Sequence, residues 1–214
     1  MAAPPSVLDE AELARGVRVL ARRDPDLARL ARDHGRPPLW ARAPGFPTLV
    51  HIVLEQQVSL ASAQAAFNRL QTASGGRVAP DSLLRFDDAE LKAIGFSRQK
   101  AGYARGLARA VLAGELDLDG LAALDDEAAR AALIRHKGLG PWTADIYLLM
   151  ALRRPDIWPS GDLALAVAVQ EVKGLPARPT SADLAAVSAG WRPWRAVAAR
   201  LFWRHYLRQR GRPD

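Results

Sequence analysis

Cysteine is missing from this chain of 214 residues, and its absence excludes several kinds of site. A chain without cysteine holds no disulfide, no thiolate nucleophile, and no zinc or iron–sulfur centre built on cysteine sulfur. The four histidines are scattered, at spacings that do not match a metal site: His34, His51, His136 and His205. Thiol chemistry and cysteine-ligated centres are therefore excluded as the basis of the protein's function.

Long hydrophobic runs are also missing, although 49% of the residues are hydrophobic. No apolar segment approaches the roughly 20 residues that a membrane-spanning helix needs. Asp9, Glu10 and Glu12 interrupt the region where a secretory signal would need an unbroken apolar segment. We therefore expect a folded intracellular protein with no membrane partner, cytoplasmic and used at the nucleoid if its source is bacterial.

Acidic residues are absent between Trp191 and the terminal Asp214, where basic residues gather. This region contains Arg192, Arg195, Arg200, Arg204, Arg208, Arg210 and Arg212. The whole chain has a net charge of +7, and a polyanionic partner would explain the imbalance through phosphate contacts. A solvated helix face in an arginine-rich protein would explain it equally well. The charge distribution therefore suggests a nucleic-acid partner but does not establish one.

Strand-type alternation of β-branched and aromatic residues is nearly missing, while Ala, Leu and Arg dominate, which favours an all-α fold. The proline-rich stretch 36–47 can only be a connector. Asp81, Asp87 and Ser97 are candidate N-caps, the last for a helix that ends near Leu112. The remaining predicted helices cover residues 9–22, about 48–73, 125–136, 141–153, 162–172, 181–189 and 194–208.

The most informative stretch begins with a tight turn between two predicted helices. Gly138 and Gly140 let the chain reverse direction, and Pro141 suits the first position of the new helix. Backbone N–H groups at that helix start, together with the charge of Lys137, can approach a phosphate. A plain helix-turn-helix corner would explain the glycines alone, so the turn needs its sequence context.

That context resembles the helix-hairpin-helix (HhH-GPD) DNA glycosylase superfamily. The hairpin Leu-Ile-Arg-His-Lys-Gly-Leu-Gly at 133–140 is followed downstream by Pro-Ser-Gly-Asp at 159–162, as in that superfamily. Within it, the segments 54–59, 95–101, 140–144 and 191–195 resemble the alkylpurine branch, the 3-methyladenine DNA glycosylase II type. The similarity spans about residues 45 to 205.

The resemblance implies an all-α fold of two helical lobes, with the helix-hairpin-helix motif and an active-site cleft between them. One lobe would be residues 46–160, ending in the hairpin, and the other would combine 1–45 with 161–214. Some relatives carry an N-terminal α/β domain, which we expect to be missing here. A monomer is expected for an enzyme that grips one duplex.

The implied activity is that of a monofunctional glycosylase in base excision repair. It would flip alkylated purines of the 3-methyladenine and 7-methylguanine type from double-stranded DNA and hydrolyse the N-glycosidic bond. Asp162 matches the family's catalytic aspartate, whose carboxylate stabilises an oxocarbenium-like transition state; a helix N-cap is the alternative role. Trp142 stands where bifunctional members have their nucleophilic lysine, so the product would be an abasic site.

The resemblance also implies a base pocket that differs from the usual one. Trp142 and Trp203 match pocket positions, where electron-rich rings would receive a positively charged purine; a place in the core is the alternative for both. Ile146 and Leu163 stand where members of this branch often have tyrosines. We therefore expect a wider and less aromatic pocket.

Flipping a nucleotide leaves a gap in the duplex, which family members fill with a wedge side chain. Gln57 matches this wedge position, where leucine is common. Its amide would hydrogen-bond the orphaned base, unless it is only a polar residue on a solvent-facing turn. The hairpin residues expected to contact DNA are Lys137, Gly138, Leu139, Gly140 and Thr143. No cofactor is required, but the family's hairpin often holds a monovalent cation such as Na⁺ or K⁺, here through the backbone carbonyls of Ile134, His136 and Leu139.

Three alternatives remain open at this point. The chain could be a glycosylase for deaminated or oxidised bases, although the missing cysteines and lysine count against the endonuclease III-like branches. It could be a non-enzymatic DNA-binding module, which would need neither Asp162 nor an aromatic pocket. A helical interaction protein with a basic surface would leave the hairpin string unexplained.

Overall fold

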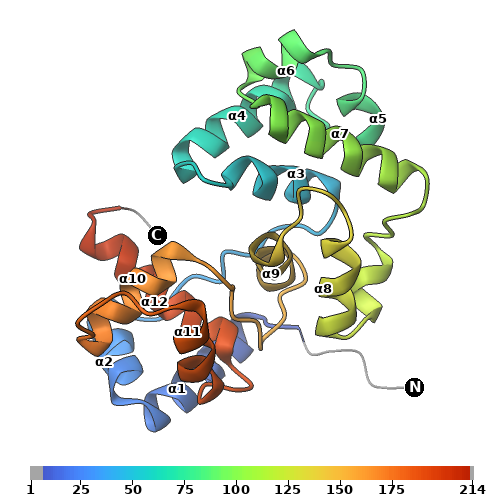
Figure 1. Cartoon of the computed structure of the whole chain (residues 1–214). Helices are drawn as coiled ribbons and strands as arrows, with labels where there is room; N and C mark the ends of the chain where they lie inside the picture. The colour runs from blue at the N-terminus through green and yellow to red at the C-terminus, as the bar shows by residue number, and fades with distance from the viewer. Residues whose placement is uncertain (1–6, 213–214) are drawn as a thin grey trace. The chain divides into compact units, whose positions relative to one another are not determined.

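The computed structural model describes residues 7–212, which form twelve α-helices and one short 3₁₀ helix and contain no strand (Figure 1). The all-α prediction is therefore confirmed. Within the described range the chain divides into two compact units. Unit 1 is residues 42–147, and unit 2 combines residues 7–41 with 148–212.

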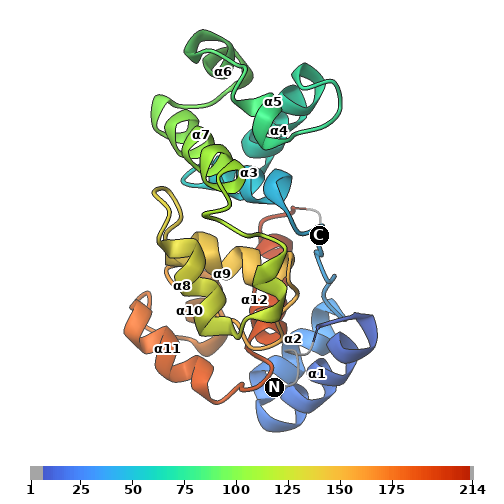
Figure 2. The same ribbon diagram turned by 90° about the vertical axis from the view of Figure 1, so that its right-hand side faces the viewer.

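Unit 1 is built around α7, which packs against α3, α5 and α6, while α4 packs against α3 and α6 (Figures 1 and 2). Its helices are α3 (Phe46–Glu55), α4 (Leu60–Ala73), α5 (Pro80–Leu83), α6 (Asp88–Ile94), α7 (Arg98–Leu112), the 3₁₀ helix η1 (Gly120–Ala123), α8 (Asp126–Ile134) and the first part of α9 (Pro141–Met150). The side chains of Asp87 and Ser97 accept the backbone N–H groups that begin α6 and α7, as the sequence predicts. Asp81 instead lies inside the first turn of α5, since Pro80 begins that helix.

The single helix predicted over residues 48–73 is wrong, because the chain breaks at residues 56–59. Gln57 has a left-handed backbone (φ +57°), and the Ser59 hydroxyl caps α4 by accepting the amide three residues on. The Lys100 Nζ donates to the Leu54 carbonyl at 2.7 Å, which satisfies one of the open carbonyls at the end of α3. The sequence conceals this break because glutamine and serine also suit a solvent-facing helix surface.

Unit 2 is built around α12, which packs against α1, α2 and α10 (Figure 1). Its helices are α1 (Glu10–Arg23), α2 (Pro25–His34), α10 (Leu163–Lys173), α11 (Ser181–Ala189), α12 (Arg195–Gln209) and the last residues of α9. The core of this unit includes Leu20, Leu27, Val169 and Phe202, each fully buried. These helices match the predicted segments to within a few residues, except that α2 was not predicted.

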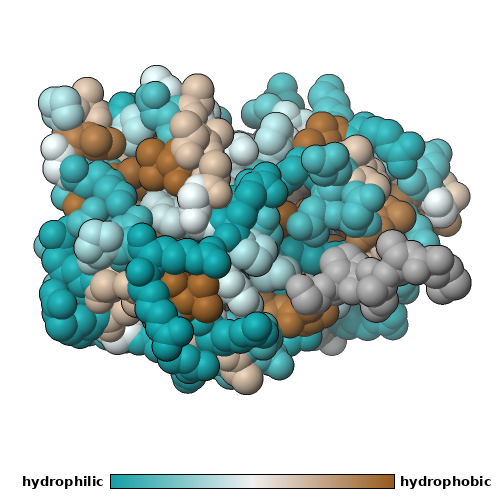
Figure 3. Space-filling model, turned by 90° about the horizontal axis from the view of Figure 1, so that it is seen from below, coloured by the Kyte–Doolittle hydropathy of each residue, from teal (hydrophilic) through white to brown (hydrophobic). Residues whose placement is uncertain are grey.

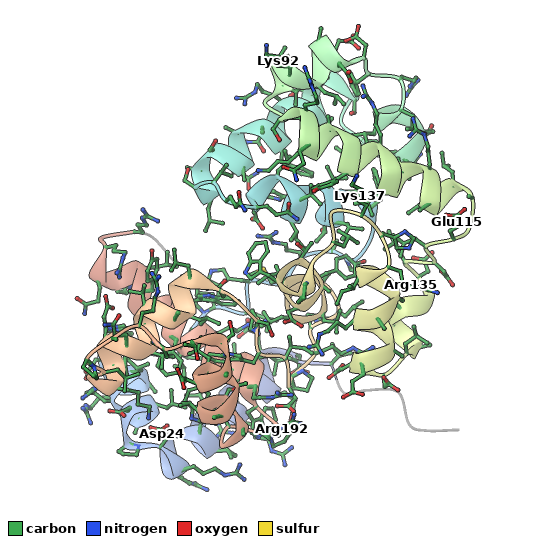
Figure 4. All side chains as sticks on the ribbon, in the orientation of Figure 1. Asp24, Lys92, Glu115, Arg135, Lys137 and Arg192 are labelled. Atoms are coloured by element: carbon green, nitrogen blue, oxygen red, sulfur yellow. The ribbon has the colours of Figure 1, made fainter. Side chains whose placement is uncertain are left out.

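Asp24 links three parts of unit 2 (Figure 4). Its carboxylate caps α2, accepts the Trp191 Nε1–H at 2.9 Å and pairs with the Lys173 Nζ at 2.9 Å. Burial works against the charged form, but the hydrogen bonds from Lys173 and Trp191 outweigh it and hold the pKa of Asp24 below its ordinary value. Asp24 is therefore a structural acid that ends one helix and begins the next.

Residues 148–160 differ from expectation, because they belong to unit 2 and not to the lobe that contains the hairpin. The Trp158 ring lies 5.3 Å from that of Trp191, centroid to centroid, and the Asp156 carboxylate pairs with the Arg195 guanidinium at 2.9 Å. The Leu8 amide also donates to the carbonyl of Arg153, in the same segment. These contacts move the boundary from residue 160 to residue 147.

On the face shown in Figure 3, hydrophilic residues predominate and hydrophobic residues form separate patches. Among the described helices, none combines the length and the apolar character that crossing a membrane requires. The described residues also contain no group of three or more histidine and acidic side chains placed to hold a metal ion.

Candidate functional site

The candidate catalytic residue, Asp162, begins α10 as its N-cap. Its Oδ1 accepts the Leu165 amide at 2.8 Å and the Trp203 Nε1–H at 3.2 Å, and the residue is 8% exposed. Gly161, with φ +75°, turns the chain into the helix. Both N–H donors therefore point at the same carboxylate oxygen, at the N-terminus of the helix. The capping role is thus present, and the catalytic role of the same carboxylate stays a prediction.

Trp203 connects this carboxylate to a second tryptophan. Its ring, nearly buried, meets the ring of Trp40 edge to face, with 6.4 Å between centroids and 71° between planes. Trp40 lies in the proline-rich connector, is half-buried and has a left-handed backbone (φ +46°). Sequence reasoning gave Trp40 no role. The feature that could have identified Trp40 is its place in the proline-rich connector, where no helix face is present to bury a large aromatic side chain.

The four predicted pocket residues fall into two pairs. Trp203 and Leu163 lie in unit 2, and Leu163 directly follows Asp162 with 58% of its surface exposed. Trp142 and Ile146 lie on the part of α9 that belongs to unit 1, the first half-buried and the second 2% exposed. Their roles in holding a base remain predictions.

The hairpin of unit 1 joins α8 to α9, and its two glycines differ. Gly138 has φ +96°, and a Cβ there would overlap the Tyr103 side chain, lying 2.6 Å from its Cδ2 and 2.7 Å from its Cβ. The Leu139 amide donates to the His136 carbonyl at 3.0 Å and closes the turn, while the Leu139 side chain is buried. Gly140 is exposed and has nothing within 4 Å of a Cβ position. The fold requires glycine at 138 but not at 140.

Three polar contacts hold the hairpin in place. The Arg130 guanidinium on α8 pairs with the buried Asp145 carboxylate on α9 at 2.6 Å. The Gln56 amide donates to the Gly138 carbonyl at 2.8 Å and to the Thr143 hydroxyl at 3.0 Å. Sequence reasoning missed Arg130, Asp145 and Gln56, although the last belongs to the quoted segment 54–59.

Thr143 departs from the role that the resemblance implied. Its side chain is 2% exposed and its hydroxyl accepts the Gln56 amide, so it supports the hairpin from inside and has no surface for DNA. Its backbone N–H, in the first turn of α9, has no partner within that helix. Any contact of Thr143 with DNA would therefore run through the main chain.

Of the other residues expected at the DNA surface, Gln57, Lys137 and Gly140 are exposed, whereas Gly138 is half-buried and Leu139 is buried. Gln57 projects from the break between α3 and α4, and its left-handed backbone carries a cost of about 1–3 kcal/mol that persists only under surrounding constraint. Lys137 lies on the loop between α8 and α9, and Arg135 follows the end of α8 (Figure 4). Gln57 and the hairpin belong to the same unit and are linked through the neighbouring Gln56.

A family model for HhH-GPD superfamily base excision DNA repair proteins matches residues 50–193, which include both the hairpin and Asp162. The chain belongs to the HhH-GPD superfamily. This membership accounts for the hairpin string that a general helical interaction protein leaves unexplained.

Two bacterial proteins are similar over most of this chain. The Bacillus subtilis protein YfjP is 27% identical over 185 residues, 83% of this chain and 64% of YfjP. The Bacillus subtilis DNA-3-methyladenine glycosylase is 28% identical over 170 residues, 74% of this chain. The match spans 56% of that enzyme, so the chain corresponds to only part of the length of these relatives.

Among solved structures, the Schizosaccharomyces pombe 3-methyladenine DNA glycosylase Mag1, in complex with abasic DNA, has a TM-score of 0.83 against this chain. It is 28% identical, and the alignment covers 88% of this chain and 95% of Mag1. The two share the helical fold over nearly the full described range.

Proposed function

We propose that this HhH-GPD protein is a monofunctional DNA glycosylase that excises alkylated purines of the 3-methyladenine and 7-methylguanine type from double-stranded DNA. The observation that carries the proposal is the carboxylate of Asp162, held at a helix start by a backbone amide and by an indole N–H in the family's motif position. The relatives named as 3-methyladenine glycosylases support the same substrate class.

In the proposed reaction the damaged nucleotide is flipped from the duplex, and the bond between C1′ and the base nitrogen breaks. The base keeps the electron pair. Since alkylation has already made it cationic, it leaves as a neutral molecule without a proton donor. The Asp162 carboxylate stabilises the positive charge that develops at C1′ and orients a water molecule for attack there. The water's proton passes to the carboxylate and then to solvent, leaving an abasic site.

The hydrogen bonds to Asp162 serve this step by fixing one carboxylate oxygen. The Leu165 amide and the Trp203 indole bind Oδ1, so the orientation of the carboxylate is set before substrate arrives. At the hairpin, Trp142 carries no amine that could attack C1′, which is the basis for proposing a hydrolytic enzyme without strand cleavage.

We further propose that the hairpin grips a phosphate of the DNA backbone. Gly140 leaves open space at the start of α9, and the charge of Lys137 is close in sequence. The implied Na⁺ or K⁺ would use backbone oxygens of Ile134, His136 and Leu139, which suit a hard cation. The His136 carbonyl already accepts one N–H and keeps a second lone pair for such a ligand.

The test measures bases released from methylated duplex DNA by the wild-type protein and by Asp162→Asn. Asparagine keeps an oxygen that can accept from Leu165 and Trp203, so the variant should remain folded. We expect 3-methyladenine and 7-methylguanine from the wild type and a loss of at least about 100-fold in the variant. The matched control is Asp9→Asn, which changes another N-cap of unit 2 and should leave release unchanged.

A wild-type protein that binds duplex DNA in a salt-sensitive manner but releases no alkylated base would refute this assignment. Duplexes that contain hypoxanthine, uracil or 8-oxoguanine would then test the deaminated-base and oxidised-base alternatives. Binding without release from any of them would leave a DNA-binding module.

A further inference from the structure

A cavity of about 490 Å³ lies in unit 1, between one face of α7 and the hairpin that joins α8 to α9. Its α7 side runs from Arg98 to Ala110, a stretch of about 18 Å at the helical rise of 1.5 Å per residue. Its hairpin side includes His136 and Lys137. The described residues that line this cavity do not include Asp162, so the proposed bond cleavage leaves the cavity without a role.

Two glycines form the floor of the cavity on α7. Gly102 and Gly106 are about one helical turn apart, both are exposed, and a Cβ at either position would have nothing within 4 Å. Glycine inside a helix is less favourable than alanine, because glycine loses more conformational freedom on folding. Packing does not require that loss at these two positions. A bare helix backbone does allow a ligand to approach α7 more closely than side chains would permit.

Tyr103 joins this face of α7 to the hairpin. Its side chain lies against Gly138, where a Cβ would be 2.6 Å from the Tyr103 Cδ2. The Gln99 amide donates to the Tyr103 hydroxyl at 2.5 Å, which leaves the hydroxyl hydrogen available as a donor. Both residues line the cavity. The two sides of the cavity are therefore held together by direct contact, and its lining includes a hydroxyl donor.

The charged residues around the cavity favour an anion. Arg98 and Lys137 are both exposed, and neither forms an ion pair within residues 7–212. Glu115, which is also exposed, lies beyond the C-terminal end of α7 (Figure 4). Two cations without partners against one acid attract a negative group, and Glu115 repels it from its own end of the cavity.

We propose that this cavity is a second contact site for the DNA backbone, in which Arg98 and Lys137 bind a phosphate and the glycine floor lets the strand approach α7. This inference rests on the proposed grip of the hairpin on DNA and extends it along α7. Lys137 belongs to both places. Since phosphates recur at short intervals along a strand, a strand held at the hairpin brings a neighbouring phosphate to the cavity.

The first experiment measures affinity for an undamaged duplex by fluorescence anisotropy over a range of salt concentrations. We expect Arg98→Gln to weaken binding by about 3-fold to 10-fold and to lower the slope of log affinity against log salt by about one. The matched control is Lys92→Gln. Lys92 is an exposed cation of α6 that does not line the cavity and lies away from Lys137 (Figure 4). This control should keep the wild-type slope.

Two further variants should produce changes that a structural role would not. Glu115→Gln removes a repulsive charge and should tighten binding by about 2-fold to 5-fold. Gly102→Ala combined with Gly106→Ala should raise the melting temperature, because alanine suits a helix better, while weakening DNA binding by about 3-fold to 10-fold. Damage to the fold would lower the melting temperature instead. Wild-type affinity in this more stable double variant refutes the close approach of the strand to α7.

A release measurement separates this inference from the proposed function. At saturating enzyme, Arg98→Gln should release alkylated bases at the wild-type single-turnover rate, because a backbone contact acts on binding. If the Arg98 effect on undamaged DNA is present but the wild type releases no base, only the proposed function fails. Wild-type affinity and salt slope in Arg98→Gln overturn the inference. If that variant then loses saturable binding of deoxyadenosine monophosphate, the cavity is a site for a small phosphorylated ligand and not for DNA.

Discussion

Alanine substitution at the two hairpin glycines should produce two different defects. Gly138 has φ +96°, where alanine is strained, and its Cβ would overlap the Tyr103 side chain. The left-handed backbone costs an alanine about 1–2 kcal/mol, and the steric overlap with Tyr103 costs about 1–3 kcal/mol more. We therefore expect Gly138→Ala to lower the free energy of unfolding by about 2–5 kcal/mol. Gly140→Ala meets nothing within 4 Å and should change stability by less than about 0.5 kcal/mol.

Urea unfolding followed by circular dichroism measures the first effect. With a denaturant dependence of about 2 kcal/mol per molar, the midpoint for Gly138→Ala should fall by roughly 1–2.5 M, while Gly140→Ala stays near the wild type. Replacing Tyr103 by alanine should recover only part of the loss, because the Tyr103 Cβ is itself 2.7 Å from the new methyl group.

Fluorescence anisotropy with a labelled duplex measures the second effect. If the hairpin grips a phosphate, the methyl group in Gly140→Ala obstructs its approach and weakens binding by about tenfold, which corresponds to about 1.4 kcal/mol. Equal stability of the two variants would refute the steric argument for Gly138. Unchanged DNA affinity in Gly140→Ala would refute the placement of a phosphate at this turn.

Two predictions concern ionisable groups. Burial is the largest cause that lowers the pKa of His51, His136 and His205, so the unfolded chain takes up protons first as the pH falls. Stability should be full above about pH 6.5 and decline below it, and a melting temperature as high at pH 5.5 as at pH 7.5 would contradict this. Lys173→Met removes the cationic partner of Asp24, whose carboxylate keeps the Trp191 indole N–H, and should cost about 1–2 kcal/mol in urea unfolding at neutral pH. Because the pKa of Asp24 is lowered in the folded state, the wild-type advantage should disappear as the pH falls below about 4, and an advantage that persists there would refute the pairing.

Features with local causes could be predicted from the sequence. Asp87 and Ser97 cap helices because their side chains reach an amide three residues away, and Gly138 permits a turn that few other residues allow. The position of Asp162 at the start of α10 follows from the same local logic, and the family membership rests on motifs that are themselves short.

Features that depend on distant partners could not be predicted. The carbonyl that Lys100 caps is 46 residues away, and it lies at a break that reads as continuous helix. Arg200 looks like one more basic residue of a surface helix, yet it is fully buried because its partners are carbonyls 51 and 161 residues away. The contact of Trp40 with Trp203 and the hydrogen bond of Thr143 with Gln56 likewise join residues that are far apart in the sequence.

Because Asp162 is both the N-cap of α10 and the proposed catalytic carboxylate, natural substitutions at this position can separate the stability of the helix from the activity. Asparagine and serine serve at a helix N-cap almost as well as aspartate, so selection for the helix alone would accept any of the three. Only aspartate supplies a negative charge. If Asp162 is the catalytic carboxylate proposed above, a homologue with serine or asparagine at this position would keep its architecture and lose its catalyst, and this single position would mark inactive descendants of the same scaffold.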